Sequence, residues 1–106
     1  MGLDNEENII KESKRDLSKF EPLYNFYYLP IFYYVYKRVS NREEADEITA
    51  LVFLKALENI SNYQFKGLPF SSWLYRIAHN TIIDMYRKNK TTRVVDVSTK
   101  QIESIA

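Results

Sequence analysis

The sequence predicts an all-α fold, a compact bundle of about three main helices. A chain of 106 residues is long enough for one small domain with one core. Hydrophobic residues make up 45% of it, so a folded core is expected rather than disorder. Only two glycines and three prolines interrupt long stretches of helical periodicity. We expect helices 20–39 and 41–60 to run antiparallel, with helix 70–88 packed across them.

The composition argues against several classes of protein. Without cysteine there is no disulfide and no thiolate metal site, which fits a reducing cytosol. No apolar run reaches membrane-spanning length, and the acidic start MGLDNEENII is unlike a signal peptide, so we expect a cytoplasmic protein without a membrane span. The lone His79 has no partner for a metal or a nucleophile, and a Gly-rich phosphate loop is absent. We therefore expect no enzyme, cofactor or metal.

The N-terminal half divides into two segments. Residues 1–17 are interpreted as a tail or as a short exposed helix starting at Asp4, and no function is assigned to them. Residues 20–39 carry six tyrosines. Pro22 suits the first turn of a helix, whereas Pro30 predicts a kink or a break. Aromatic residues on nearly every face predict burial against more than one neighbour, with the hydroxyl groups reaching the surface.

Helix 41–60 has the clearest start, because Ser40 followed by Glu43 reads as a capping box. Its predicted core stripe consists of Ala45, Ile48, Val52, Phe53, Ala56 and Ile60. Leu51 and Leu54 project to the opposite side, among acidic residues. They form either a partner-docking patch or a second buried stripe covered by the tyrosine-rich helix.

Residues 61–70 are predicted to be a loop, because Asn62, Gly67 and Pro69 interrupt helices. Tyr63 and Phe65 have two interpretations: loop anchors that pack onto the core, or aromatic rings that flank an unstacked base. We expect at least one of them to pack.

Residues 70–88 are predicted to form a helix with two faces. The side predicted to be buried carries Phe70, Trp73, Leu74, Ile77, Ala78, Thr81 and Met85. The other side carries Ser72, Arg76, His79, Asn80, Ile83 and Arg87. Residues 61–93 hold six basic side chains against one acid, Asp84, although the whole chain has a net charge of only +1. This local positive charge favours a nucleic-acid-reading helix, and the alternative is a solvated face of an ordinary amphipathic helix.

The order of these features resembles the second conserved region of sigma-70 family transcription initiation factors, in particular the extracytoplasmic-function (ECF) type. The resemblance covers residues 18–90. The first helix contributes Leu23-Tyr24, Tyr27-Tyr28, Pro30 and Phe32-Tyr33. The remaining matches are residues 41–48 (NREEADEI), 52–57 (VFLKAL), 65–67 (FKG) and 69–80 (PFSSWLYRIAHN).

This resemblance implies that the acidic helix docks on the clamp helices of the RNA polymerase β′ subunit. Carried over by position, the polymerase-binding residues are Asp46, Glu47, Ala50, Leu51, Leu54 and Lys55. The loop and helix that follow would recognise and melt the minus-ten promoter element by holding bases of the non-template strand. The corresponding DNA-binding residues are Asn62, Tyr63, Phe65, Lys66, Ser72, Trp73, Arg76, His79, Asn80, Asp84, Arg87 and Lys88. Of these, Trp73 is expected to serve mainly in the core.

The chain departs from the family pattern in three ways. Ala50-Leu51 stand where the family often has Gln-Glu, so docking would rely on apolar contact. His79 replaces a frequent arginine and would weaken or re-tune a phosphate contact. The second, helix-turn-helix domain of the family has no counterpart in 106 residues. We infer a fragment or an isolated domain, with residues 91–106 the start of an interdomain linker.

Two points stay open on the sequence alone. The resemblance leaves room for an anti-sigma factor as a further partner. The alternative function is a helical protein–protein interaction or dimerisation module of a regulator, built on Leu51 and Leu54, without nucleic-acid binding.

Overall fold

The computed structural model of the protein describes the backbone of residues 2–96 and the side chains of residues 2–88. Its elements are α1 (Glu6–Arg15), the 3-10 turn η1 (Leu17–Phe20), α2 (Glu21–Val39), α3 (Arg42–Asn59), the 3-10 turn η2 (Ile60–Asn62) and α4 (Phe70–Asp96). Since this described part contains helices and no strand, the all-α prediction is confirmed. None of its helices is both long and apolar enough to cross a membrane.

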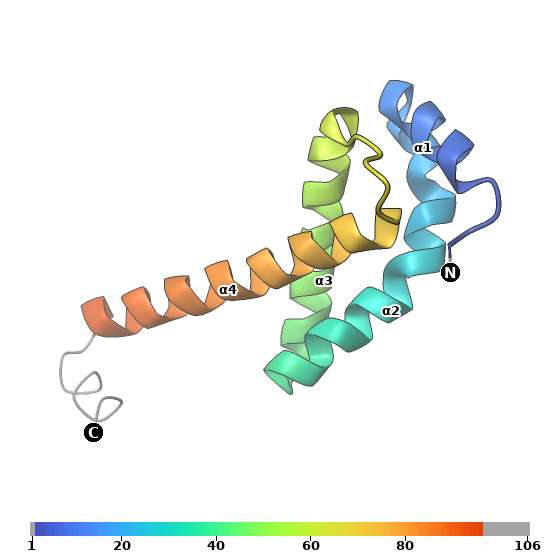
Figure 1. The fold of residues 1–106 in the computed structure, drawn as a ribbon. Coiled ribbons are helices and arrows are strands. Elements are labelled where there is room, and N and C mark those ends of the chain that lie inside the picture. The colour runs from blue at the N-terminus through green and yellow to red at the C-terminus, as the bar shows by residue number, and fades with distance from the viewer. Residues whose placement is uncertain (1, 97–106) are drawn as a thin grey trace.

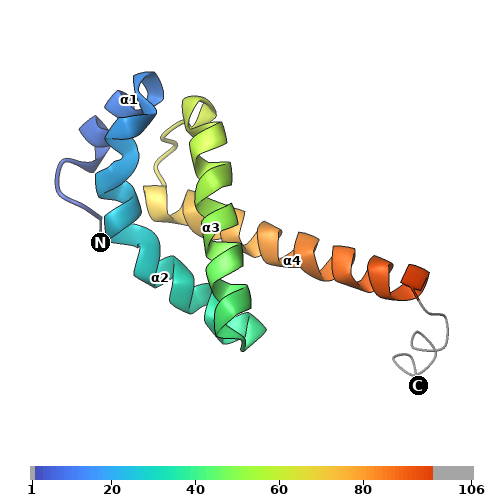
Figure 2. The same ribbon diagram turned by 180° about the vertical axis from the view of Figure 1, so that it is seen from behind.

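The three long helices form the body of the domain. α2 and α3 pack side by side and run in opposite directions, and α4 crosses both of them, as expected (Figures 1 and 2). α1 lies at the end of the bundle where the loop before α4 also lies. The far half of α4 extends beyond the other helices (Figure 1). The bundle therefore holds the loop before α4 and the first half of α4 in place, whereas the far half of α4 has no neighbouring helix in the described part of the chain (Figure 1).

The turn between α2 and α3 differs from the predicted capping box. Ser40 adopts a left-handed backbone conformation (φ 56°) that ends α2, and its N–H donates to the Tyr36 carbonyl. The side chain that caps α3 is Asn41, which accepts a hydrogen bond of 2.9 Å from the Glu44 N–H. The prediction of Ser40 as the cap was wrong because the tight turn uses this residue to close the preceding helix.

Pro30 does not break α2, so the break that we considered is wrong. The helix runs from Glu21 to Val39, and its axis changes direction between its two halves (Figures 1 and 2). A proline leaves the carbonyl four residues earlier without its helical partner. That carbonyl belongs to Phe26, and both residues have exposed side chains, so water can reach this side of the helix.

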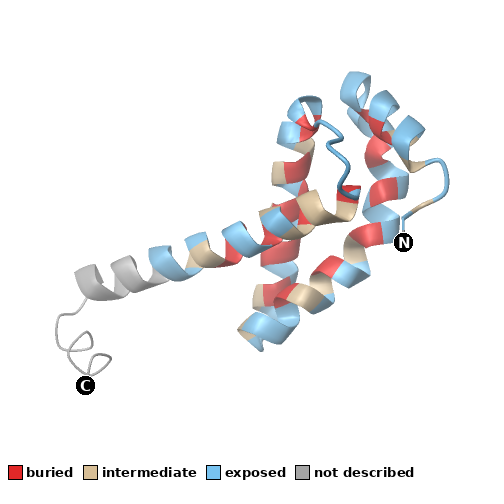
Figure 3. Ribbon diagram, viewed as in Figure 1, coloured by how far each residue is buried: buried red, intermediate tan, exposed pale blue. Residues whose placement is uncertain are grey.

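The core lies between α2, α3 and α4 (Figure 3). All six residues of the predicted α3 stripe are buried, which confirms it. The predicted inner side of α4 is also confirmed, because four of its members are buried and Trp73, Ile77 and Met85 are half-buried against the core. Ile82 is buried too, and the two-face assignment missed it.

The aromatic residues of α2 are buried on some sides of the helix and exposed on others. Leu23, Tyr27, Ile31 and Val35 face the core, but several other large side chains stay exposed. The exposed ones are Tyr24, Phe26, Leu29, Tyr33 and Tyr36. The predicted burial against more than one neighbour is confirmed, since α2 packs against both α3 and α4, but these helices cover only part of its circumference.

Both ends of the described chain also differ from expectation. Residues 6–15 form α1 rather than a tail, and the helix is docked rather than exposed, since Ile10 is 7% exposed and belongs to the core. At the other end α4 continues to Asp96, beyond the predicted 70–88. Residues 97–106, most of the expected linker, lie outside the described residues. The domain boundaries at 17 and 90 stay predictions.

A pair of leucines tests this description of the core. Leu74 is fully buried on α4, whereas Leu54 on α3 is 51% exposed. Leu74→Ala should lower the free energy of unfolding by about 2–5 kcal/mol. Leu54→Ala should change it by less than about 0.5 kcal/mol, as is usual for surface substitutions. Urea denaturation followed by circular dichroism measures both, and equal losses would contradict the assigned crossing of α4.

Candidate nucleic-acid interface and docking face

The candidate interface is built around an aromatic cluster at the start of α4. Phe70, 2% exposed, contacts three other rings: Tyr63 at 5.2 Å, Trp73 at 5.3 Å and Tyr27 at 5.9 Å between centroids. Tyr63 and Trp73 also contact each other at 5.1 Å. Burial raises the pKa of the Tyr63 phenol, and nearby Glu6 and Glu7 raise it further. Since Tyr63 is only 8% exposed, it is the loop anchor that the sequence anticipated.

The rest of the loop projects outward. Every residue from 64 to 69 is exposed, and Gly67 takes a positive φ of 81° that side chains rarely adopt. Phe65 is 65% exposed and, within the described chain, pairs with no other ring. Asn62 and Lys66 are also exposed. Each interpretation therefore applies to one of the two aromatic residues. Tyr63 packs on the core as a loop anchor, and Phe65 presents a ring on which a base could stack.

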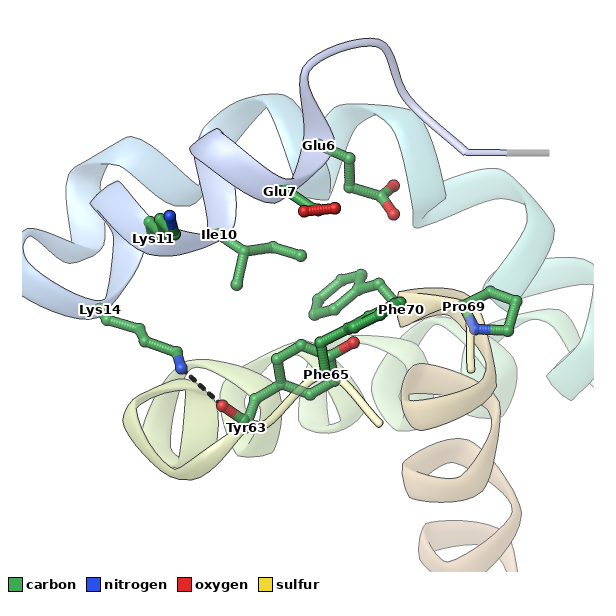
Figure 4. A pocket seen from close by; sticks show the side chains of 9 residues that line it. All are labelled: Glu6, Glu7, Ile10, Lys11, Lys14, Tyr63, Phe65, Pro69 and Phe70. Atoms are coloured by element: carbon green, nitrogen blue, oxygen red, sulfur yellow. Dashed lines mark hydrogen bonds between the residues drawn. The ribbon is translucent and has the colours of Figure 1, made fainter. Parts of the chain in front are cut away.

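Two hollows flank this loop. One, of about 80 Å³, has a lining that includes Lys66, Ser72, Trp73 and Arg76, so it brings together residues predicted separately from the loop and from α4. The other, of about 280 Å³, lies between α1 and the loop (Figure 4). Its lining consists of Glu6, Glu7, Ile10, Lys11, Lys14, Tyr63, Phe65, Pro69 and Phe70. The participation of α1 was missed because residues 1–17 carry no motif.

The outer face of α4 continues from the first hollow. Ser72, Arg76 and Asn80 are spaced four residues apart and so form one line along the helix. Arg76, His79, Asn80, Arg87 and Lys88 are exposed, and Ser72 is half-buried. Except for Lys88, which helical periodicity places further round, these side chains share one face. They can offer guanidinium, amide and imidazole groups to one strand of nucleic acid.

Asp84 lies to the side of that face and contacts α3. The Lys55 ammonium is 3.8 Å from an Asp84 carboxylate oxygen and donates to the Thr81 hydroxyl at 3.2 Å. Thr81 in turn donates to the Ile77 carbonyl. Lys55 was predicted to bind polymerase and Asp84 to bind DNA, yet the fold joins them. Lys55 thereby offsets the single acid within residues 61–88.

The predicted docking residues on α3 form an exposed surface. Asp46, Glu47, Ala50 and Leu54 are exposed, and Leu51 is half-buried. With Leu54 51% exposed, the tyrosine-rich helix does not cover it, so a second buried stripe is ruled out there. Asp46 accepts a hydrogen bond of 3.0 Å from the Tyr28 hydroxyl. We call Glu47, Ala50, Leu51 and Leu54 the docking face.

A hollow of about 270 Å³ lies between α2 and the start of α3. Its lining includes Leu29, Tyr33, Tyr36 and Asp46, so exposed side chains of α2 and the start of α3 meet there.

Among the described residues, no three His, Asp or Glu side chains lie close enough together to hold a metal ion.

Comparison with known proteins assigns the chain to a family. Residues 23–92 match the Sigma-70 region 2 family, and the chain belongs to that family. Its relatives place it with the ECF type. The ECF RNA polymerase sigma factor SigW of Bacillus subtilis is 33% identical over 97 residues, which cover 91% of this chain and 51% of that protein. The ECF RNA polymerase sigma factor BldN of Streptomyces coelicolor is 32% identical over 71 residues, 67% of this chain and 27% of that protein.

A third relative is the RNA polymerase sigma factor SigZ of Bacillus subtilis, 33% identical over 75 residues, which cover 71% of this chain and 42% of that protein. The chain thus spans about a quarter to a half of the length of these relatives. The family match begins at Leu23, so α1 and η1 lie outside it.

The two loop aromatics should behave oppositely when truncated. Tyr63→Ala removes a ring that packs on Phe70 and Trp73 and should cost about 2–4 kcal/mol of unfolding free energy. Phe65→Ala, its matched control in the same loop, should change that free energy by less than about 0.5 kcal/mol. Urea titration of both variants is the measurement. A Phe65→Ala loss as large as that of Tyr63→Ala would contradict the assignment of Phe65 as a free ring.

Proposed function

We propose that this sigma region 2 domain binds the RNA polymerase core through the docking face on α3. We further propose that it recognises and melts the minus-ten promoter element through the loop and the outer face of α4. The observation that carries the proposal is the exposed Phe65 ring on the loop that leads directly into α4, whose outer face carries the line of Ser72, Arg76 and Asn80. The domain would act by binding alone and perform no chemical step.

The loop supplies what capture of an unpaired base requires. Stacking on an aromatic ring is worth about 1–3 kcal/mol per base, and Phe65 offers such a ring. Flipping a base out of a duplex costs a few kcal/mol. Because the stacking energy is gained only with unpaired bases, it shifts the equilibrium towards the open strand. Lys66 and Arg76, which line one hollow, would hold the phosphates on either side of the captured base.

The charge distribution supports a strand that follows α4. Its outer face offers Arg76 and Arg87, and Lys55 offsets the carboxylate of Asp84 from the side. Phosphate contacts of this kind give affinity without sequence preference, whereas an amide such as that of Asn80 can pair with a base edge. Asn80 is therefore proposed to read sequence and Arg87 to hold the backbone.

The polymerase contact rests on a different surface. Leu54 is an exposed apolar side chain next to Glu47 and Ala50, the composition of an apolar anchor with an acidic flank. Lys55 and Asp46 were also predicted to bind polymerase, but each has a partner inside the domain. We therefore assign the contact chiefly to Leu54, Ala50 and Glu47.

An anti-sigma factor is proposed as a further partner of the sigma function. A second candidate function is a helical protein–protein interaction or dimerisation module of a regulator, without nucleic-acid binding. The exposed Leu29, Tyr33 and Tyr36, which line a hollow with Asp46 at the start of α3, favour it. The two functions differ in their response to salt. Strand binding that strengthens steeply as salt falls supports the proposed function, and no strand binding at low salt supports the module.

Replacement of two side chains on α4 separates base reading from phosphate binding. Asn80→Ala should weaken binding of a minus-ten non-template strand by about 1–3 kcal/mol, with little effect on a scrambled strand. Arg87→Ala should weaken both strands alike and reduce the slope of log K against log salt by about 1. Fluorescence anisotropy over a salt series measures both. Equal losses on both strands with Asn80→Ala would remove it as a base reader.

Polymerase docking is tested with a recombinant β′ clamp-helix fragment. Leu54→Arg should weaken binding at least about tenfold, since it puts a charge into the centre of an apolar contact. Leu68→Arg is the matched control, because Leu68 is 54% exposed like Leu54 but lies in the loop before α4, outside the docking face. Isothermal titration calorimetry compares the two. If both variants bind like the unchanged chain, the docking face is not the polymerase contact.

A further inference from the structure

The loop before α4 has few bonds of its own. Its ends are tied by the Tyr63 N–H to the Ile60 carbonyl at 3.1 Å and by the Ser72 N–H to the Pro69 carbonyl at 3.0 Å. Between them, residues 64–68 make no further hydrogen bond within the described chain. The residues assigned to base capture therefore lie on a segment that needs an anchor from elsewhere in the fold.

α1 supplies that anchor. The Lys14 ammonium donates a hydrogen bond of 2.6 Å to the Tyr63 carbonyl, across 49 positions of sequence (Figure 4). The same ammonium lies 5.9 Å from the centre of the Tyr63 ring. Ile10, one turn earlier on α1, lines the 280 Å³ hollow together with Phe65. α1 thus bonds to the backbone of the loop through Lys14 and lines, through Ile10, the hollow that Phe65 also lines.

α1 is itself held in place at its other end. The Tyr27 hydroxyl of α2 donates to a Glu6 carboxylate oxygen at 2.5 Å, and that oxygen also accepts from the Leu3 N–H. Glu6 and Lys14 are eight residues apart, so these two attachment points are separated by about 12 Å along the helix. Ile10, buried between them, adds an apolar contact. A helix fixed at two points and in its middle can impose a position on the loop.

We propose that α1 is a positioning clamp for DNA recognition: Lys14 fixes the Tyr63 backbone, and through it the direction in which Phe65 and Lys66 point. We call Glu6, Lys14 and their partners Tyr27 and Tyr63 the α1 clamp. This role rests on the proposed function, since the loop it positions is the one assigned to base capture. Lys14 acts through the loop and is a positioning residue, not a DNA contact.

Three variants of the 106-residue chain test the clamp. Lys14→Met removes the donor, and Lys14→Arg keeps a cationic donor. Lys11→Met is the matched control: it removes the same charge from the same hollow, where Lys11 makes no hydrogen bond to the described chain. Exchange of the Tyr63 amide with deuterium is followed by NMR, because that N–H is bonded to Ile60 inside the anchored turn. The Val52 amide in the core of α3 reports on global opening.

The clamp predicts a local effect. Lys14→Met should speed exchange at Tyr63 at least about fivefold, leave Val52 unchanged and lower the order parameters of amides 64–68. Affinity for the minus-ten strand should fall about tenfold. Lys14→Arg should keep the exchange rate at Tyr63 and the strand affinity close to those of the unchanged chain. Lys11→Met should change neither quantity. Because Trp73 is the single tryptophan and contacts Tyr63, its emission should shift in Lys14→Met alone.

Unchanged exchange at Tyr63 in Lys14→Met overturns the clamp, and so do equal affinity losses in Lys14→Met and Lys11→Met, which would indicate a charge effect only. Faster exchange without any loss of strand affinity overturns its role in recognition. Failure of the unchanged chain to bind any strand contradicts the proposed function instead, and the exchange rate at Tyr63 then still decides whether α1 holds the loop.

Discussion

The packing of the Phe70 ring is the contact on which the rest of the structure depends. It lies where α4 begins and touches Tyr63 of the loop, Trp73 of α4 and Tyr27 of α2. Each ring belongs to a different part of the chain, so one buried side chain fixes the loop, the start of α4 and the bundle relative to one another. A surface that captures bases must be preorganised to bind well. In this domain, the packing of Phe70 in the core holds the loop and the start of α4 in fixed positions before any ligand binds.

The same fold keeps the two candidate surfaces apart. The inner stripe of α3 packs in the core, which leaves Leu54 and Glu47 facing away from it. The outer face of α4 carries Arg76 and Asn80, and a partner on α3 need not displace a strand on α4. Between the two surfaces, α3 and α4 are also joined by the Lys55–Asp84 ion pair, which is partly exposed. Such a pair is worth at most about 1 kcal/mol, so it joins the surfaces without locking them.

Sequence periodicity predicted the three long helices and most of the buried and exposed residues of α3 and α4, because those features depend on residues three and four positions apart. The core stripe of α3 and the outer line of α4 were found this way. Contacts between distant residues had no such signal: Lys14 meets Tyr63 across 49 positions, and Lys55 meets Thr81 across 26. Ser40 was misassigned because it could cap one helix or end another, and only the turn geometry decides. Phe65 and Tyr63 look alike in sequence, and packing alone distinguishes them.

The central claim is that one domain carries two separate surfaces, one for a DNA strand and one for polymerase. NMR titration of the labelled chain with a minus-ten non-template strand and, separately, with a β′ clamp-helix fragment tests it most directly. The account predicts that the strand shifts amides within residues 62–80 and leaves 47–54 unchanged, and that the fragment does the reverse. Shifts in one common set of residues for both ligands, or no shifts with either, would contradict it.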